Sequence, residues 1–364
     1  MHIFSNNPIV RQCLETIAHT VLENGGEIHP ALCINHEAER LWITCPAECD
    51  GETLLHIPND LFIPVSHLSW TEVNGVLVYS GDTSTLSDAQ HTNLDAMVRL
   101  YNATDKIEKI AKRFPDSLFR QDTELWAQIQ IARPTQTLSE KNLAEQFIST
   151  RLSSQNNEDS EESIDSIMPL IDMLDHHPYA PKYGRNEAKD WIIPVQHPVP
   201  GSEQCFVRYQ KGDSFANALW HGYFESAARY LSSVQCTFVQ ESLGQIVVHG
   251  VNYERRKLNA PFVQRTENSL DIYSIILDPN TLGALHTFLG LAARSKDRSL
   301  NQAEAEIIAK TMILQIIKAN QDYFEMLREF CSNAPAELPL RTLFYAVAKH
   351  QLDVLQEIEQ CLTK

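Results

Sequence analysis

The sequence predicts an α+β fold in which a strand-rich region interrupted by helices precedes an all-helical C-terminal region. Two observations support this prediction. Short runs with β-type composition alternate with polar turns over most of the first 280 residues. After about residue 280, apolar residues instead recur at helical spacing.

The first predicted elements are a helix and three short strands. Residues 8–23 place Ile9, Cys13 and Ile17 near helical spacing and run into the turn signal Asn24-Gly-Gly26. Short apolar runs between polar turns then predict strands, at 31–35, 40–45 and 53–58.

A helical interruption follows. Residues 92–114 carry a stripe of apolar side chains and predict one helix. Residues 153–163 contain no apolar residue and are net acidic, which predicts a surface loop.

A second strand-rich block brings chemically interesting side chains together. It comprises the runs 191–195, 205–209 and 246–253. The first two, with the Pro200-Gly201 turn between them, predict a hairpin that places Tyr209 at the end of a strand. Four aromatic residues follow on a predicted helix, namely Phe215, Trp220, Tyr223 and Phe224. A phenol beside aromatic side chains is typical of a small pocket, and also of ordinary core.

The last stretch of the chain predicts a helical bundle packed as its own unit. Residues 303–330 and 340–362 both repeat apolar side chains at helical spacing.

Length and charge narrow the function. The 364 residues are enough for two or three domains, and the formal net charge is −17. This charge argues against binding to a nucleic-acid backbone and suits a basic protein or peptide partner. We expect no signal peptide. No apolar stretch is long enough for a membrane span. The eight cysteines are scattered, which predicts a cytoplasmic location.

Metal binding is a minor alternative. Cys45 and Cys49 lack a second Cys/His pair nearby in the sequence, so no zinc site is expected there. The side chains of Asp172, Asp175 and the His176-His177 pair could hold a metal, or they could form a polar turn. The first alternative leaves a metal-dependent hydrolase as a third hypothesis for the function. Common nucleotide-binding, hydrolase and zincin motifs are absent.

Two segments together resemble a known protein family. IMPLIDMLDHH (167–177) resembles the segment ending in Asn-His of SET-domain methyltransferases, and RYQKGDSFANALWHGYF (208–224) resembles their later Tyr-Gly…Gly-Phe segment. The similarity is to the branch that contains Rubisco large-subunit lysine methyltransferase. Residues 23–26, 50–58, 285–289 and 341–348 resemble further parts of that branch, so the likeness extends over nearly the whole chain.

The resemblance implies a fold and a domain division. The fold is the knotted arrangement of short strands of SET domains, here over residues 1–240, with a helical insert at about 85–165 that contains the acidic loop 153–163. Residues 241–364 correspond to a mostly helical domain similar to the substrate-binding domain of that branch.

The resemblance also implies a reaction and its residues. Family members transfer a methyl group from S-adenosylmethionine to a protein side chain, with lysine the favoured acceptor here. Tyr209 matches the active-site tyrosine, and Asp175 and His176 match the Asn-His pair that contacts the cofactor. Tyr223 matches the aromatic residue beside the substrate channel, and Arg40 and Leu41 fall in the cofactor loop.

Several positions depart from the family pattern. The Gly-x-Gly of the cofactor loop is replaced by Glu39-Arg40-Leu41, and the Asn of Asn-His is Asp175. Gln210 replaces the glycine after the tyrosine, and Ser214 replaces a later asparagine. These departures leave a second hypothesis open: a catalytically inactive SET-like module that binds a protein partner.

Overall fold

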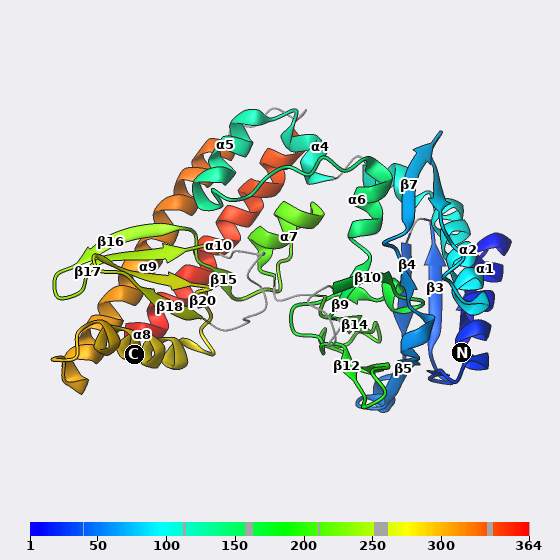
Figure 1. Ribbon diagram of the computed structural model, residues 1–364, viewed down its shortest axis with the longest axis horizontal. Coiled ribbons are helices and arrows are strands. Elements are labelled where there is room, and N and C mark those ends of the chain that lie inside the picture. Colours follow the sequence, from blue (N-terminus) through cyan, green and yellow to red (C-terminus); the bar gives the residue numbers. More distant parts are fainter. Residues whose placement is uncertain are drawn as a thin grey trace. The chain divides into compact units, whose positions relative to one another are not determined.

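The computed structural model describes the chain apart from seven short stretches (Figure 1), which are Glu39, 112–113, 157–162, 210–211, 251–260, 333–337 and Lys364. Two compact units form, and each draws on two segments of the chain. The first unit comprises residues 1–113 and 140–211, and the second comprises 114–139 and 212–364. None of the helices in the described ranges is both long enough and apolar enough to cross a membrane.

In its described residues, the first unit combines many short strands with four α-helices. The strands are β1 (His2–Phe4), β2 (Glu27–Ile28), β3 (Cys33–Glu37), β4 (Arg40–Thr44), β5 (Thr53–Ile57), β6 (Ile63–Pro64), β7 (Leu68–Val73), β8 (Val76–Gly81), β9 (Leu152–Asn156), β10 (Ser163–Ile167), β11 (Asp175–His176), β12 (Gly184–Arg185), β13 (Trp191–Pro194) and β14 (Phe206–Val207). The helices are α1 (Pro8–Glu23), α2 (Asp88–Ala103), α3 (Lys106–Ala111) and α6 (Leu143–Ser149), with 3-10 turns η1 (Ala47–Cys49), η2 (Asn59–Leu61) and η3 (Ile171–Met173).

Helix α1 confirms the first sequence prediction. The Asn7 side chain accepts hydrogen bonds from the amides of Ile9 and Val10, and Pro8 occupies the first helical position, where no amide donor is needed. The buried face of α1 includes Leu14 and Ile17. This face gives the helix its place in the core, and α1 also packs along α2.

The predicted single helix over 92–114 is wrong. Helix α2 ends at Ala103, and α3 begins only at Lys106. Asp105 between them has φ of 50°, in the left-handed region, which an α-helix cannot contain. Thr104 is buried and its hydroxyl bonds back to the Leu100 carbonyl, so the chain turns at this point.

The predicted hairpin between 191–195 and 205–209 is also wrong. Strand β13 pairs with β5 and β12, whereas β14 pairs in parallel with β11. Prolines at 194, 198 and 200 lack the amide donors that a continuous antiparallel ladder needs. The tight turn itself does form, with the Ser202 amide bonded to the Val199 carbonyl.

Part of the predicted acidic loop is strand. Strands β9 and β10 pair antiparallel, from Ser163 opposite Asn156 to Ile167 opposite Leu152. Ile167 is fully buried, so one face of this ribbon joins the core. The central residues 157–162 of the predicted loop lie outside the described residues.

The second unit places a four-stranded sheet beside a helical bundle. Its helices are α4 (Pro115–Phe119), α5 (Thr123–Ala132), α7 (Ser214–His221), α8 (Leu282–Lys296), α9 (Gln302–Cys331) and α10 (Pro339–Thr363). Its strands are β15 (Leu231–Ser232), β16 (Cys236–Gln240), β17 (Gly244–His249), β18 (Phe262–Arg265), β19 (Ser269–Tyr273) and β20 (Ile276–Leu277). The strand order of the sheet is β16-β17-β19-β18. Helix α9 contacts strand β16 and packs against both α8 and α10.

The helical prediction for the end of the chain is confirmed. Helices α9 and α10 match the predicted ranges 303–330 and 340–362 within one residue at each end, and α8 begins two residues after position 280. The α+β class is therefore confirmed. Helix α7 is shorter than predicted, because Gly222 with φ of 69° ends it before Tyr223 and Phe224.

Residues 114–139 belong to the core of the second unit. Phe119, Leu125 and Ile129 are fully buried there, together with side chains of α9 and α10. The predicted helical insert at 85–165 is helical over much of its length, but its middle packs with this unit. The boundary predicted at residue 240 divides the chain by its resemblance to family domains, not by the packing of the two units. This boundary stays a prediction.

Candidate active site

Strand β11 brings the predicted cofactor residues close to the predicted catalytic tyrosine. Asp175 and His176 pair with Phe206 and Val207 of β14, and Tyr209 follows two residues later. The Tyr209 amide donates to Nδ1 of His176 over 3.1 Å, and the two rings lie 5.4 Å apart. The parallel pairing of β11 and β14 therefore gathers residues that are 33 positions apart in the sequence.

The hydroxyl of Tyr209 points inward. It donates to the carbonyl oxygen of Leu174, the residue before β11. Although 41% of the residue surface is exposed, burial raises the pKa of the Tyr209 phenol well above its ordinary value, and nearby Tyr183 and Asp172 raise it further. The phenol therefore stays protonated at neutral pH and can donate a hydrogen bond.

A buried network of charged and aromatic groups lies beside this tyrosine. Asp172 accepts from the Tyr101 hydroxyl over 2.8 Å and from Arg151 over 3.0 Å. The Arg151 guanidinium also lies 4.2 Å from the centre of the Phe147 ring. Burial, reinforced by Arg151, lowers the pKa of Lys106 to about 8. Sequence reasoning missed Tyr101, Arg151 and Lys106, because they lie far from the motifs in the chain.

One of the predicted cofactor-loop residues, Arg40, contacts strand β11. Arg40 lies 3.5 Å from the carboxylate of Asp175 and 3.1 Å from the side-chain oxygen of Gln204. Gln204 in turn donates to Asp175 over 2.6 Å. Leu41 is 4% exposed and belongs to the core, whereas Glu39 lies outside the described residues. No sequence signal distinguished Gln204.

Tyr223 belongs to the second unit, whereas the other five predicted residues belong to the first. Its ring centre lies 6.0 Å from that of His221, at the end of α7. Its role beside a substrate channel stays a prediction. Ser214 is buried and donates to the Glu225 carbonyl, while Gln210 falls outside the described residues.

The acidic and histidine side chains at 172–177 do not form a metal site in the part of the chain that is described. Asp172 is already bonded to Arg151. Nδ1 of His177 accepts from the Tyr179 amide over 3.2 Å, and its ring lies against Phe206. This arrangement does not support the hydrolase reading.

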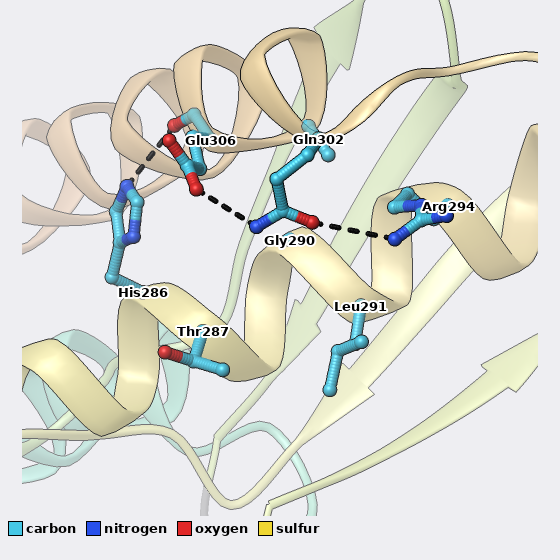
Figure 2. A pocket seen from close by; sticks show the side chains of 8 residues that line it. His286, Thr287, Gly290, Leu291, Arg294, Gln302 and Glu306 are labelled. Atoms are coloured by element: carbon cyan, nitrogen blue, oxygen red, sulfur yellow. Dashed lines mark hydrogen bonds between the residues drawn. The ribbon is translucent and has the colours of Figure 1, made fainter.

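A hollow between α8 and α9 is too small to be a substrate site (Figure 2). His286, Arg294, Gln302 and Glu306 are among the residues that line it, and the cavity holds about 70 Å³. Gln302 accepts a hydrogen bond from Arg294 of α8 and donates one to Glu306 of its own helix. Pockets for small ligands usually hold about 300–1,000 Å³, so this one suits only water.

Comparison with known proteins returns structures of the family that the motifs resemble. The chain is similar to the SET domain of LSMT bound to methyllysine and AdoHcy, at 13% identity and a TM-score of 0.39. It is also similar to Rubisco LSMT bound to AdoMet, at 14% identity and a TM-score of 0.37. Both alignments cover 96% of this chain and 91% of the other.

No protein-family model matches the chain, and no curated protein sequence matches it.

Proposed function

We propose that this protein transfers a methyl group from S-adenosylmethionine to the side-chain amine of a protein substrate, with lysine the favoured acceptor. One observation supports this most directly. The Tyr209 hydroxyl bonds to the Leu174 carbonyl, directly before Asp175 and His176, so the candidate catalytic group and two candidate cofactor contacts share one location.

The donor set fits the amino-acid part of this cofactor. Arg40 offers a cation that can pair with a carboxylate, and Asp175 offers an anion that can pair with an ammonium group, with 3.5 Å between them. When bound, the cofactor supplies an activated methyl group on a sulfonium centre. The oxygen atoms of Tyr209, Leu174 and Asp175 make the surroundings favourable for positive charge.

The protein's own residues must orient the acceptor amine. A lysine amine has a free pKa of about 10.4, so little of it is neutral at pH 7. Tyr209, held by Leu174 and neutral at this pH, can fix an amine nitrogen through its oxygen lone pair. A net charge of −17 favours basic segments as substrates.

The test replaces the phenol with a ring of the same shape. We expect Tyr209→Phe to lower transfer of labelled methyl to lysate proteins by at least about 100-fold, because misplacing a reacting group costs this much. Cofactor affinity measured by calorimetry should change little. Tyr345→Phe, on the exposed face of α10, makes the same change in the second unit and should leave transfer intact. Failure of the wild type to bind the cofactor at millimolar concentration would refute the proposal.

A second candidate function is a binding module without chemistry. Arg40, Asp175 and Gln204 already satisfy one another, and the family's glycines are absent from this loop. This reading expects capture of a basic partner that is equally strong in the wild type and Tyr209→Phe, with no heat of cofactor binding.

A further inference from the structure

Two loops and a strand end bring one histidine and two cysteines together in the first unit. His29 follows β2, Cys45 follows β4 and Cys49 ends the short helix η1. The ligand atoms of these three residues all lie within 4.8 Å of one another. We call them the His-Cys-Cys cluster. We expected no zinc site here, because Cys45 and Cys49 lack a second Cys/His pair nearby in the sequence.

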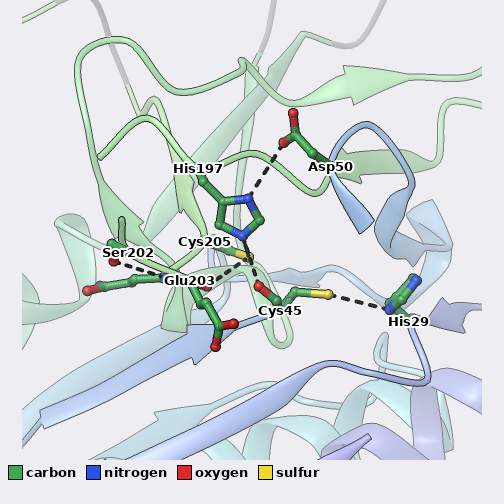
Figure 3. Close-up of polar contacts among 8 residues, drawn as sticks. His29, Cys45, Asp50, His197, Ser202, Glu203 and Cys205 are labelled. Carbon is green, nitrogen blue, oxygen red and sulfur yellow. Dashed lines mark hydrogen bonds and ion pairs between the residues drawn. The ribbon is translucent and has the colours of Figure 1, made fainter. Parts of the chain in front are cut away.

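The spacing is close to what zinc requires. Zinc bonds of about 2.3 Å to sulfur and 2.0–2.1 Å to nitrogen, arranged tetrahedrally, separate a sulfur from a nitrogen by about 3.6 Å. Sγ of Cys45 lies 3.5 Å from Nδ1 of His29, and the thiol points at the ring (Figure 3). The Cys49 sulfur lies within 4.8 Å of both of these atoms.

The second nitrogen of His29 has the partner that metal-bound histidines usually have. Nε2 lies 2.8 Å from a carboxylate oxygen of Glu52, which can only accept, so the ring hydrogen belongs on Nε2. The Nδ1 lone pair therefore faces Cys45. The Ala31 amide also approaches Nδ1, at 3.2 Å, and a bound metal would replace it as the partner of that lone pair.

More thiols stand close by. Burial, together with the neighbouring Cys205, Cys49 and Cys33, raises the pKa of Cys45 to about 12. Burial likewise raises the pKa of Cys205 to about 12. Several thiols in one partly buried place repel one another as thiolates, and a divalent cation removes that repulsion.

We propose that His29 Nδ1, Cys45 Sγ and Cys49 Sγ bind a zinc ion, with a water molecule in the fourth position. Binding replaces the proton of each thiol by a bond to zinc, so at least two protons are released. No electron transfer is involved.

The ion would fix the end of β4 against the candidate active site. The Cys45 amide bonds to the Glu203 carbonyl and the Cys205 amide to the Ile43 carbonyl, at 3.0 and 2.9 Å. Gln204 lies between these two bonds and donates to Asp175. Zinc at the His-Cys-Cys cluster therefore acts as a structural clamp on the strand that carries Arg40.

The first experiment measures zinc in the full chain after a reducing agent, added zinc and desalting. We expect one zinc per chain, and cobalt substitution should give the intense visible absorption of tetrahedral thiolate coordination. Cys45→Ser and Cys49→Ser should lose both signals. Cys361→Ser, an exposed cysteine of α10, should keep them. Zinc-free wild type, signals that survive both cluster variants, or a Cys45–Cys49 disulfide in the reduced preparation would each overturn the proposal.

A second experiment does not disturb the buried thiols. Glu52 is largely exposed, so Glu52→Gln should fold normally and yet bind zinc about 10–100-fold more weakly, as loss of a carboxylate partner of a ligand histidine does. Because two thiols lose protons, the apparent zinc affinity of the wild type should rise about 100-fold per pH unit near neutrality. The assigned ligands would be contradicted if Glu52→Gln bound zinc as tightly as the wild type and the zinc affinity of the wild type did not depend on pH.

Discussion

At the scale of single residues, Lys106 is the clearest case of an ionisable group held in unfavourable surroundings. Burial, reinforced by the nearby Arg151, lowers its pKa from 10.5 to about 8. Asp172 and Asp175 only partly compensate. The charged Lys106 ammonium therefore lowers the free energy of unfolding near neutral pH.

This cost should depend on pH with a defined sign. Below pH 8 the amine is charged in both the folded and unfolded states. Between pH 8 and about 10.5 the folded state releases the proton while the unfolded chain keeps it, so the contribution of Lys106 to the unfolding free energy rises with pH. The full rise corresponds to about 3 kcal/mol.

We therefore expect Lys106→Met to be more stable than the wild type at pH 7.5, by up to about 3 kcal/mol, with the difference shrinking at pH 10. Urea unfolding at the two pH values measures this. Lys310→Met, on the exposed face of α9, controls for loss of a lysine elsewhere. A difference that stays constant across the two pH values would show that Lys106 does not titrate in this range.

At the scale of elements, one ion pair joins α5 to α10. Arg341 donates to both carboxylate oxygens of Asp122, at 2.7 and 2.8 Å, and also to Glu124. The Asp122 carboxylate is only 4% exposed, and it accepts the Leu125 amide at the start of α5. The same carboxylate therefore caps one helix and holds a second.

We expect Arg341→Ala to lower the unfolding free energy by about 3–5 kcal/mol, because it leaves a buried carboxylate without its partner. Chemical denaturation measures the loss. Arg298→Ala, at an exposed position after α8, should change stability by less than about 0.5 kcal/mol. Equal stability of the two variants would mean that solvent replaces Arg341.

The contribution of this contact to the unfolding free energy also rises with pH, as that of Lys106 does, but at acidic pH. The Arg341 hydrogen bonds hold the pKa of Asp122 below its ordinary value. Its stabilisation is therefore complete above the unfolded pKa of about 3.9 and is lost as pH falls through the lower folded value.

Helices at the two ends of the chain could be predicted because their apolar periodicity is regular and their caps are local. The start of α1 and that of α9 have such caps, at Asn7 and Asn301. The break at Asp105 could not be predicted, because the apolar stripe continues across it and only the backbone angle reveals it. Strand β13 pairs with β5 at Thr53–Ile57, which is more than 100 positions away in the chain. No local sequence pattern encodes this partner or that of β14.

The candidate site shows the same division. The sequence motifs pointed to Tyr209, Asp175 and His176, which the pairing of β11 with β14 brings together. The residues that surround them come from other elements, as Arg151 does, and a single sequence holds no signal for such contacts. The approach of His29 to Cys45 escaped prediction for the same reason.

At the scale of the whole molecule, the second unit depends on residues 114–139. Phe119, Leu125 and Ile129 are fully buried in its core. Arg133 is buried as well and donates to the carbonyls of Ser232 and Ser233. Each large apolar side chain contributes about 1.5–3 kcal/mol by burial, so this segment accounts for much of the stability margin of a domain, which is about 5–15 kcal/mol.

We expect a fragment of residues 212–364 to be poorly folded on its own, and the same fragment with 114–139 joined to its N-terminus to fold. Amide dispersion in NMR spectra and the cooperativity of thermal unfolding distinguish the two. Cooperative unfolding of the shorter fragment at the same temperature as the longer one would contradict the importance of the segment.

The interleaving of the two units also constrains the order in which the chain can fold as it is made. Asp122 and Arg341 are 219 residues apart. At about 5–20 residues per second, the ribosome needs roughly 10–45 s to produce the second after the first. During this time Phe119, Leu125 and Ile129 have no partners from α9 and α10. The nascent chain therefore exposes an apolar segment for tens of seconds, which makes it a site for chaperone binding during synthesis.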